Sequence, residues 1–221
     1  MTEQITQGPK NIREQLLQKR LSFVTAQDSS LHVSGTLGEG STATVYECVS
    51  TRDDIPAVLK VSVMREGISP REISSYRRLD GIPNISRLLQ TYGQGEHVIA
   101  MRLQKIIGMP LPHITASYKE RIPGVLIRIH EIIEGFHARG MLMPDDWLKE
   151  DNWLIVEDGS PYLIDLGEVK EMTEEATFEI ERDFRLFASL VKKYTAEIRG
   201  KDKKTLERLV YRDLLSRGWG L

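Results

Sequence analysis

The sequence has little cysteine, no long hydrophobic run and almost no net charge. Its single cysteine, Cys48, excludes an internal disulfide and is typical of a protein in a reducing compartment. No apolar run approaches the roughly 18–20 residues that a helix needs to cross a bilayer. The opening stretch, MTEQITQGPKNIREQ, lacks the basic head and apolar core of a cleaved secretory signal. We therefore expect a soluble chain, and secretion by a route that leaves no cleavable signal stays open.

The charges are nearly balanced, with 30 Lys and Arg against 32 Asp and Glu and a net charge of −2. Such a balance gives no reason to expect nucleic acid or an anionic membrane as a partner. The 221 residues, of which 40% are hydrophobic, are enough for one sizeable domain or for two small lobes that share a cleft. The composition does not distinguish a monomer from an oligomer.

Hydrophobic patterning predicts a strand-rich front half, which includes one helix, and a helix-rich back half. Ser69, Pro70 and Glu72 form a helix-start pattern, and Asp158-Gly159 is typical of a hairpin turn. Strands are expected within residues 31–50, 57–63, 87–106 and 152–167, and helices over 11–21, 70–79, 120–140, 178–194 and 203–217. This order predicts the α+β class, with an arm over residues 1–30, a first lobe over 31–103 and a second lobe over 104–221.

The stretch LGEGSTATV carries two glycines, Gly38 and Gly40, followed by Val45. Glycines of this kind let backbone amides approach phosphate oxygens, although a glycine-bearing hairpin next to an ordinary strand gives the same letters. The spacing to Lys60, in AVLK, adds weight to the first interpretation. It is the separation expected when a valine covers an adenine and a lysine on a neighbouring strand reaches the phosphates.

A buried lysine needs a carboxylate beside it, and Glu72 on the following helix is the first candidate for Lys60. Glu66 is the second candidate. The alternative for Glu72 is that it only completes the capping box of its helix. Both interpretations fit the sequence.

Asn152 and Asp165 stand at the ends of two short apolar runs, in KEDNWLI and YLIDLG. Carboxylate and amide oxygens facing a phosphate group would hold Mg²⁺. An aspartate within an apolar strand is otherwise costly, because burial without a partner takes several kcal/mol. Asn152 by itself could be a turn residue, and the pair with Asp165 favours a metal site.

Taken together, G-x-G…V, AVLK, a helix glutamate, N-W-L-I and D-L-G resemble the eukaryotic-like protein kinase family over roughly residues 33 to 195. The resemblance implies a bilobal fold, with an antiparallel-sheet N-lobe containing one helix, a reduced and mainly helical C-lobe, and ATP with Mg²⁺ in the cleft. It places Met101 near the gatekeeper position and the backbone of residues 102–104 against adenine. The residues implied for ATP are Gly38, Gly40, Ser41, Val45, Lys60, Met101 and Leu103. Asp183 resembles the helix aspartate that steadies the catalytic loop, although it could equally be a helix N-terminal charge.

The catalytic loop departs from the family pattern at one position. Aligned without gaps on H-R-D-L-K-P-E-N, the sequence places Lys149 at the phosphate lysine and Asn152 at the metal asparagine, but Trp147 at the base aspartate. Tryptophan cannot accept a proton. Either the loop holds one extra residue and Asp146, or failing that Asp145, supplies the carboxylate, or the chain is a pseudokinase that binds a partner without catalysis.

Only 54 residues would follow the D-L-G motif if the chain is taken as ending at Leu221, far fewer than an ordinary protein kinase uses. In this respect, and in GEGSTATVYE and AMRLQKIIGMPL, the chain resembles the minimal kinases that Gram-negative bacteria inject into host cells by type III secretion. These are the HopBF-like, OspG-like and NleH-like effectors. The resemblance implies a serine/threonine protein kinase secreted into the host cytoplasm, and the HopBF-like group would imply the chaperone HSP90 as substrate. A small-molecule kinase of the aminoglycoside or choline type is a further alternative, although the chain has little room for the helical insertions of such enzymes.

Overall fold

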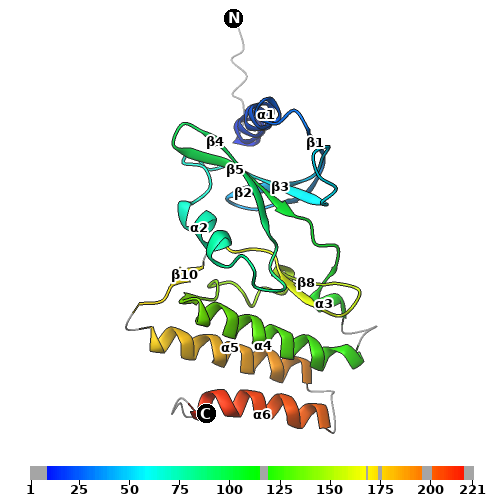
Figure 1. The fold of residues 1–221 in the computed structure, drawn as a ribbon, viewed down its shortest axis with the longest axis vertical. Helices are drawn as coiled ribbons and strands as arrows, with labels where there is room; N and C mark the ends of the chain where they lie inside the picture. Colours follow the sequence, from blue (N-terminus) through cyan, green and yellow to red (C-terminus); the bar gives the residue numbers. More distant parts are fainter. Residues whose placement is uncertain (1–8, 115–118, 168, 174–175, 196–200, 217–221) are drawn as a thin grey trace, which may run out of the picture. The chain divides into compact units, whose positions relative to one another are not determined.

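The computed structural model describes residues 9–114, 119–167, 169–173, 176–195 and 201–216 (Figure 1). Contacts between Cα atoms divide the chain into two compact units. Unit 1 comprises Met1–Ile73 and Arg87–Lys105, and unit 2 comprises Ser74–Ser86 and Ile106–Leu221.

Unit 1 is built on a five-stranded antiparallel sheet with the strand order β1-β2-β3-β5-β4. The strands are β1 (Leu31–Glu39), β2 (Ala43–Ser50), β3 (Ala57–Ser62), β4 (Leu88–Gln94) and β5 (His97–Gln104). Consecutive strands are joined by short turns, except between β3 and β4, where the chain passes through a helix. This is the antiparallel meander that the sequence predicts for the front half.

Helix α1 (Pro9–Gln27) lies against one face of this sheet. Leu17 and Val24, seven residues apart and therefore on one side of the helix, join a buried cluster with Leu59, Val61 and other apolar side chains of the strands. Cys48 lies in the same cluster, where burial raises the pKa of its thiol to about 11. The predicted helix over residues 11–21 was too short, because Val24 anchors a further turn and a half in this core.

Helix α2 (Pro70–Arg78) begins in unit 1 and ends in unit 2. The hydroxyl of Ser69 accepts a hydrogen bond from the amide of Arg71 (3.3 Å), and the carbonyl of Ser69 accepts one from Ile73 (3.3 Å). Ser69 therefore caps the helix, as the helix-start pattern predicts.

Unit 2 is mainly helical, with short strands at its edge. Its helices are α3 (Leu111–Ile114), α4 (Ile122–Ala138), α5 (Thr177–Thr195) and α6 (Lys201–Ser216), and its strands are β6 (Met109–Pro110), β7 (Met141–Leu142), β8 (Trp153–Ile155), β9 (Pro161–Leu163) and β10 (Lys170–Glu171). Two single-turn 3₁₀ helices, Lys119–Arg121 and Glu150–Asn152, precede α4 and β8. The sheet-rich first unit and the helix-rich second unit confirm the α+β class.

The longest helices of unit 2 pack against one another. The apolar face of α4 is buried, including Ile129, Ile133 and Phe136. His130 on that face packs beside the rings of Phe184 and Phe187 of α5, with ring centroids 5.8 and 5.2 Å apart. This core supports the loop that follows α4, where the predicted catalytic residues lie.

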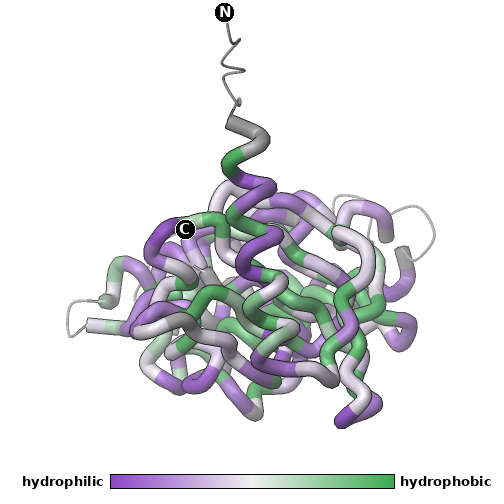
Figure 2. The backbone as a smooth tube through the Cα atoms, turned by 90° about the horizontal axis from the view of Figure 1, so that it is seen from above, coloured by the Kyte–Doolittle hydropathy of each residue, from purple (hydrophilic) through white to green (hydrophobic). Residues whose placement is uncertain are grey.

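Hydrophilic and hydrophobic residues alternate along the chain in Figure 2. Within the described residues, no helix combines the length and the apolar character needed to cross a membrane.

Candidate active site

Four predicted site residues lie in one row across the sheet of unit 1. Gly38 pairs with Val45 between β1 and β2, Val45 pairs with Lys60 between β2 and β3, and Lys60 pairs with Met101 between β3 and β5. Directly paired residues of antiparallel strands project their side chains from the same face. Leu103 lies two residues beyond Met101 and so on that face as well. The sequence indicated Gly38 by its glycine pair and Val45 and Lys60 by their spacing, and the resemblance implied Met101 and Leu103. The strand register brings these residues together.

The glycine-bearing turn is exposed throughout residues 35–42. It is closed by a hydrogen bond from the amide of Gly40 to the carbonyl of Ala43 (2.8 Å), with Ser41 exposed at its tip. A Cβ atom added at Gly38 would meet nothing within 4 Å, and one added at Gly40 would make only an ordinary contact, 3.5 Å from the Ala43 carbonyl oxygen. Within the described residues, the fold itself therefore does not require glycine at residue 38, and the open space beside it can admit a ligand.

Lys60 forms an ion pair with Glu72 of α2, with Nζ and Oε1 2.7 Å apart. Only 13% of the lysine side chain and 9% of the glutamate side chain are exposed. The carboxylate of Glu72 is thus engaged with Lys60, whereas Glu66, the second candidate, is exposed. A nearly buried ion pair of this kind is strong evidence that Glu72 holds the ammonium of Lys60 in position, because an unpaired charge at the same depth would be costly.

In unit 2, three predicted residues meet around one turn of the loop between β7 and β8. The ammonium of Lys149 lies 2.9 Å from the carboxylate of Asp146, and the backbone amide of Lys149 donates to the carbonyl of Asp146 (2.8 Å). The side-chain amide of Asn152 donates to the same carbonyl (3.2 Å). Asp146 is therefore the centre of this arrangement, with its side chain 26% exposed.

Trp147, the residue at the position of the base in the alignment without gaps, is completely buried. Its ring meets that of Trp153 edge to face, with centroids 6.3 Å apart, and the indole N–H of Trp153 donates to the carbonyl of Trp147 (2.6 Å). Trp147 is a core residue that anchors the loop. Its presence therefore does not favour the pseudokinase interpretation, since the neighbouring Asp146 keeps part of its side chain exposed.

The two adjacent aspartates have different partners. Asp145 bonds with Lys170 of β10 through one carboxylate oxygen and with Arg182 of α5 through the other. Hydrogen bonding from Lys170, aided by Arg182, lowers the pKa of Asp145 below its ordinary value in spite of partial burial. Asp145 is thus committed to two cations outside the group formed by Asp146 and Lys149.

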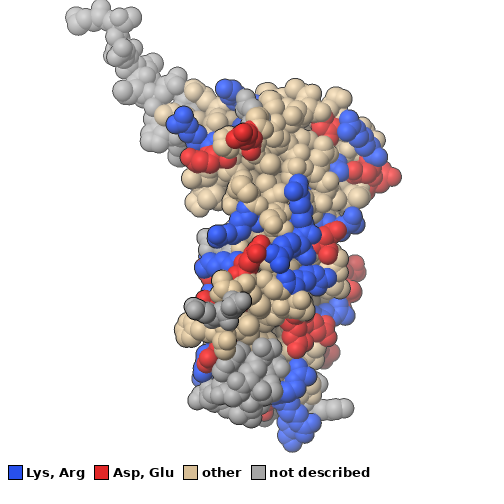
Figure 3. All heavy atoms as spheres, turned by 60° about the vertical axis from the view of Figure 1, so that its left-hand side comes forward, with Lys and Arg blue, Asp and Glu red and all other residues tan. Residues whose placement is uncertain are grey.

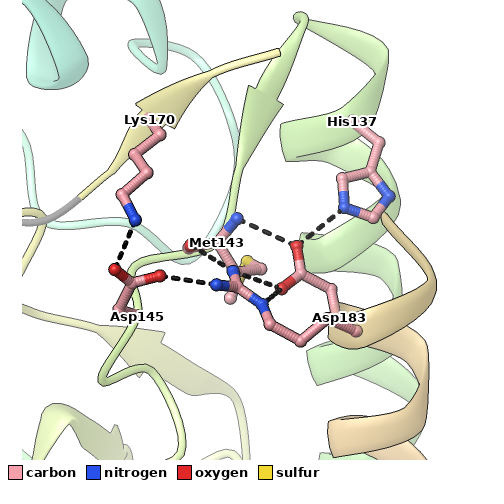
Figure 4. A network of polar contacts seen from close by, with 6 residues as sticks. His137, Met143, Asp145, Lys170 and Asp183 are labelled. Atoms are coloured by element: carbon pink, nitrogen blue, oxygen red, sulfur yellow. Dashed lines mark hydrogen bonds and ion pairs between the residues drawn. The ribbon is translucent and has the colours of Figure 1, made fainter. Parts of the chain in front are cut away.

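Asp183 of α5 lies behind the loop, fully buried (Figure 4). One carboxylate oxygen accepts a hydrogen bond from the backbone amide of Met143 (3.1 Å) and lies 3.0 Å from Nε2 of His137. The other oxygen pairs with Arg182 at 2.9 Å. Asp183 stands in the second turn of α5, so it is not a charge at the helix N-terminus. Its contact with Met143 is the kind of contact that the resemblance implies.

Asn152 and Asp165 lie at the same end of the β8–β9 hairpin, since the amide of Ile164 donates to the carbonyl of Asn152 (3.0 Å). The hydroxyl of Tyr76 donates to the carbonyl of Ile164 (3.2 Å) and so helps to hold this end in place. Because the side-chain nitrogen of Asn152 is used as a donor to Asp146, its oxygen remains as the candidate metal ligand.

The donor set at this hairpin end fits Mg²⁺, which prefers hard oxygen ligands and commonly binds through one or two carboxylates together with phosphates. Among the described residues, no group of three or more His, Cys, Asp or Glu side chains could hold a metal. A bound Mg²⁺ would therefore need further oxygen ligands, such as those of phosphate groups and water, in addition to Asp165 and Asn152.

A family model described as the protein kinase domain matches residues 31–189. The chain belongs to the protein kinase family. The matched range includes the row in unit 1, the loop around Asp146 and the start of α5. The kinase-like fold implied by the sequence motifs is therefore confirmed.

Solved structures support the same fold. The structure of PK-1, the kinase of the Cydia pomonella granulovirus, matches with a TM-score of 0.56 at 15% identity. The alignment covers 70% of the present chain and 60% of the viral kinase. No curated protein sequence matches the chain.

Two sets of contacts around the candidate site were not visible in the sequence. The first is the set of contacts made by His137, Lys170 and Arg182, which are far apart along the chain and match none of the motifs. The second is Arg13 of α1, which donates to the carbonyl of Gly40 (2.9 Å) and so ties the helix to the glycine-bearing turn. Only the folded chain brings these residues together.

Residues 102–104, whose backbone was expected to bind adenine, belong to strand β5 of the sheet. Strand β5 pairs with β3 as far as Gln104, whose amide also donates to the carbonyl of Arg87 (2.9 Å). The amide of Lys105 donates to the carbonyl of Pro56 (2.7 Å). Adenine binding by the backbone of residues 102–104 therefore stays a prediction, and it would have to use groups that these bonds leave available.

Proposed function

We propose that the chain is an ATP- and Mg²⁺-dependent serine/threonine protein kinase. The observation that carries the proposal is the ion pair between Lys60 and Glu72. In active kinases the strand lysine and the helix glutamate must be paired for the lysine to bind the phosphates. Here the pair is formed, with Lys60 in the row that also contains Val45 and Met101.

The chemical roles follow from the two groups of residues. Lys60 and Lys149 supply positive charge for the phosphate oxygens, where charge develops during transfer. Asp146 is the base: its carboxylate orients the substrate hydroxyl and accepts its proton as the oxygen bonds to the γ-phosphorus. The bond from that phosphorus to the bridging oxygen of ADP breaks in the same displacement.

Asn152 and Asp165 are the residues that would hold Mg²⁺. When bound, the ion would neutralise negative charge on the phosphates. The role of Gly38, Gly40 and Ser41 is to let the exposed turn approach the nucleotide phosphates, for which the open space beside Gly38 leaves room.

The resemblance to minimal effector kinases supplies the biological part of the proposal. We infer secretion into a host cell and phosphorylation of a host protein, with the chaperone HSP90 as the first candidate substrate. The sequence features behind this inference are the stretches GEGSTATVYE and AMRLQKIIGMPL.

Transfer of labelled γ-phosphate from ATP·Mg²⁺ tests the proposal, with purified HSP90 and a eukaryotic lysate as acceptors. The variants are Asp146→Asn, Asp145→Asn and Asp165→Asn, and the matched control is Asp151→Asn, an exposed aspartate of the same loop. We expect Asp165→Asn to abolish transfer, Asp146→Asn to lower it by about 10²–10⁴-fold, and Asp151→Asn to leave it unchanged.

Two outcomes would overturn parts of the proposal. Full activity of Asp165→Asn would exclude the kinase mechanism described here. Nucleotide binding by the wild type without transfer to any acceptor, or to itself, would identify a pseudokinase. Labelling of serine or threonine in a protein other than HSP90 would leave the enzyme class intact and replace the substrate.

A further inference from the structure

Strand β10, which follows Asp165 by five residues, is held on both sides by ion pairs. Lys170 pairs with Asp145, and Glu171 pairs with Arg78 at the end of α2 (2.6 Å). The backbone pairs as well, Lys170 with Leu142 and Glu171 with Met141. The amide of Met172 then donates to the carbonyl of Gly140 (2.8 Å), which extends the attachment by one residue.

Asp145, the acceptor of Lys170, has a second cationic partner, as Figure 4 shows. Arg182 binds the second oxygen of Asp145, and it also donates to the carbonyl of Met143 (3.3 Å) and to the buried carboxylate of Asp183. Asp145 therefore connects β10, through Arg182, to the buried carboxylate of Asp183. Asp145 also directly precedes Asp146 along the chain, so its position restricts that of the proposed catalytic base, Asp146.

In many kinases the segment after the metal-binding aspartate becomes ordered only after phosphorylation, because the added phosphate forms new pairs with arginine. In the present chain the signs of the two charges are exchanged. The loop carries the anion, Asp145, and the segment carries the cation, Lys170, so the ion pair forms without any phosphate. On the face that carries α2 and β10, lysine and arginine atoms lie beside aspartate and glutamate atoms (Figure 3).

We infer that Lys170, Asp145, Arg182, Glu171 and Arg78 form a clip that holds β10 beside the catalytic loop without phosphorylation. We call this set the β10 clip. Asp145 and Lys170 are accordingly positioning residues, which act through Asp146. The effect of the β10 clip on phosphoryl transfer rests on the proposed function, whereas its effect on the order of β10 does not.

Hydrogen exchange tests the clip independently of activity. In the full chain, Lys170→Met should speed exchange of the Met172 amide by about tenfold or more, because β10 then keeps only its two-residue ladder and the ion pair between Glu171 and Arg78. Lys170→Arg should keep the protection, since arginine preserves the charge. Lys192→Met, at an exposed lysine of α5, is the matched control and should change nothing. Equal exchange in Lys170→Met and wild type would overturn the inference.

Kinetics then separate positioning from base catalysis. Asp145→Asn and Lys170→Met should each lower kcat about tenfold with KM for ATP unchanged. The double variant should be no slower than Asp145→Asn alone, because Asp145→Asn already removes the charge that Lys170 binds. A loss of about 10²–10⁴-fold that is confined to Asp145→Asn would instead make Asp145 the base and overturn its assignment as a positioning residue.

Phosphatase treatment completes the test. The wild type, treated with phosphatase and freed of it, should transfer phosphate at its initial rate from the first turnover. Loss of activity that returns after autophosphorylation would contradict the clip. If the wild type transfers no phosphate at all, the proposed function fails, and the exchange experiment alone decides whether the clip exists.

Discussion

The ammonium of Lys60 lies 2.7 Å from the carboxylate of Glu72, and both side chains are almost completely buried. The two residues come from different elements, β3 and α2, so the ion pair fixes where the first turn of the helix meets the sheet. A cation held at this depth by one carboxylate can approach phosphate oxygens without losing its own orientation.

The substitution Glu72→Gln should lower kcat/KM for phosphate transfer by at least about tenfold, because Lys60 loses the charge that orients it. Glu66→Gln is the control, since Glu66 is exposed and was the other candidate partner. It should behave as wild type. Steady-state kinetics with varied ATP would measure both, and thermal unfolding would show that each variant is folded. A larger loss in Glu66→Gln would mean that the active form pairs Lys60 differently.

Substitutions of Trp147 test which residue of the catalytic loop supplies the base. Trp147→Asp restores an aspartate at the base position of the alignment without gaps, yet the side chain there is completely buried. We expect it to destabilise the fold by several kcal/mol and to add no activity, because an unpaired carboxylate would enter the core.

The companion variant Trp147→Phe should retain the fold and the activity, since its ring still packs on Trp153. The substitution also removes an indole N–H that has no hydrogen-bond partner within the described structure. Urea denaturation would measure both variants. Activity in Trp147→Asp above that of wild type would show that the base belongs at residue 147, as the alignment without gaps places it, in spite of the burial of that residue.

The sequence predicted the residues of the site better than their connections. Val45 and Lys60 were predicted because fixed spacing on adjacent strands is also fixed register, which a single sequence can show, whereas Met101 was implied by the resemblance to protein kinases. The different fates of Asp145 and Asp146 could not be found in this way. They depend on Lys170 and Arg182, which are 25 and 37 residues from Asp145 along the chain.

The same limit applies to the N-terminal helix. The helix predicted over residues 11–21 contains the apolar residues Ile12, Leu16 and Leu17, but only contacts with the sheet decide which of them are buried. Ile12 remains 64% exposed, whereas Leu17 and Val24 enter the core. Arg20 is also buried, because it donates to the carbonyl of Ser62 at the end of β3 (2.6 Å) and to that of Met64, two residues later (2.7 Å).

Helix α1 should therefore contribute to the stability of unit 1. Val24→Ala removes two buried methyl groups and should lower the free energy of unfolding by about 1–3 kcal/mol. Ile12→Ala, on the same helix but exposed, should change it by no more than about 0.5 kcal/mol. Chemical denaturation of the full chain provides the comparison. Equal effects of the two substitutions would show that α1 does not stay packed on the sheet in solution.

Asp28, directly after α1, gives the fold a dependence on pH. Burial alone would raise its pKa, but hydrogen bonds from Ser30 and Tyr92 and the charge of Arg52 outweigh burial and lower the pKa below its ordinary value. A carboxylate with a lowered pKa in the folded state stabilises the protein above its unfolded pKa, which is about 3.9, and loses this contribution as the pH falls through its folded pKa.

Asp28→Asn should thus be less stable than wild type by about 1–3 kcal/mol at neutral pH, where the buried hydroxyls of Ser30 and Tyr92 lose a charged acceptor. The difference should shrink as the pH is lowered through about 4 and below, because wild type then protonates its own carboxyl. Asp54→Asn, at an exposed aspartate, is the control and should follow wild type at each pH. Denaturation curves at a series of pH values would measure all three proteins. A constant difference between Asp28→Asn and wild type across this range would show that the loss comes from packing, since the charge of Asp28 would then contribute nothing to stability.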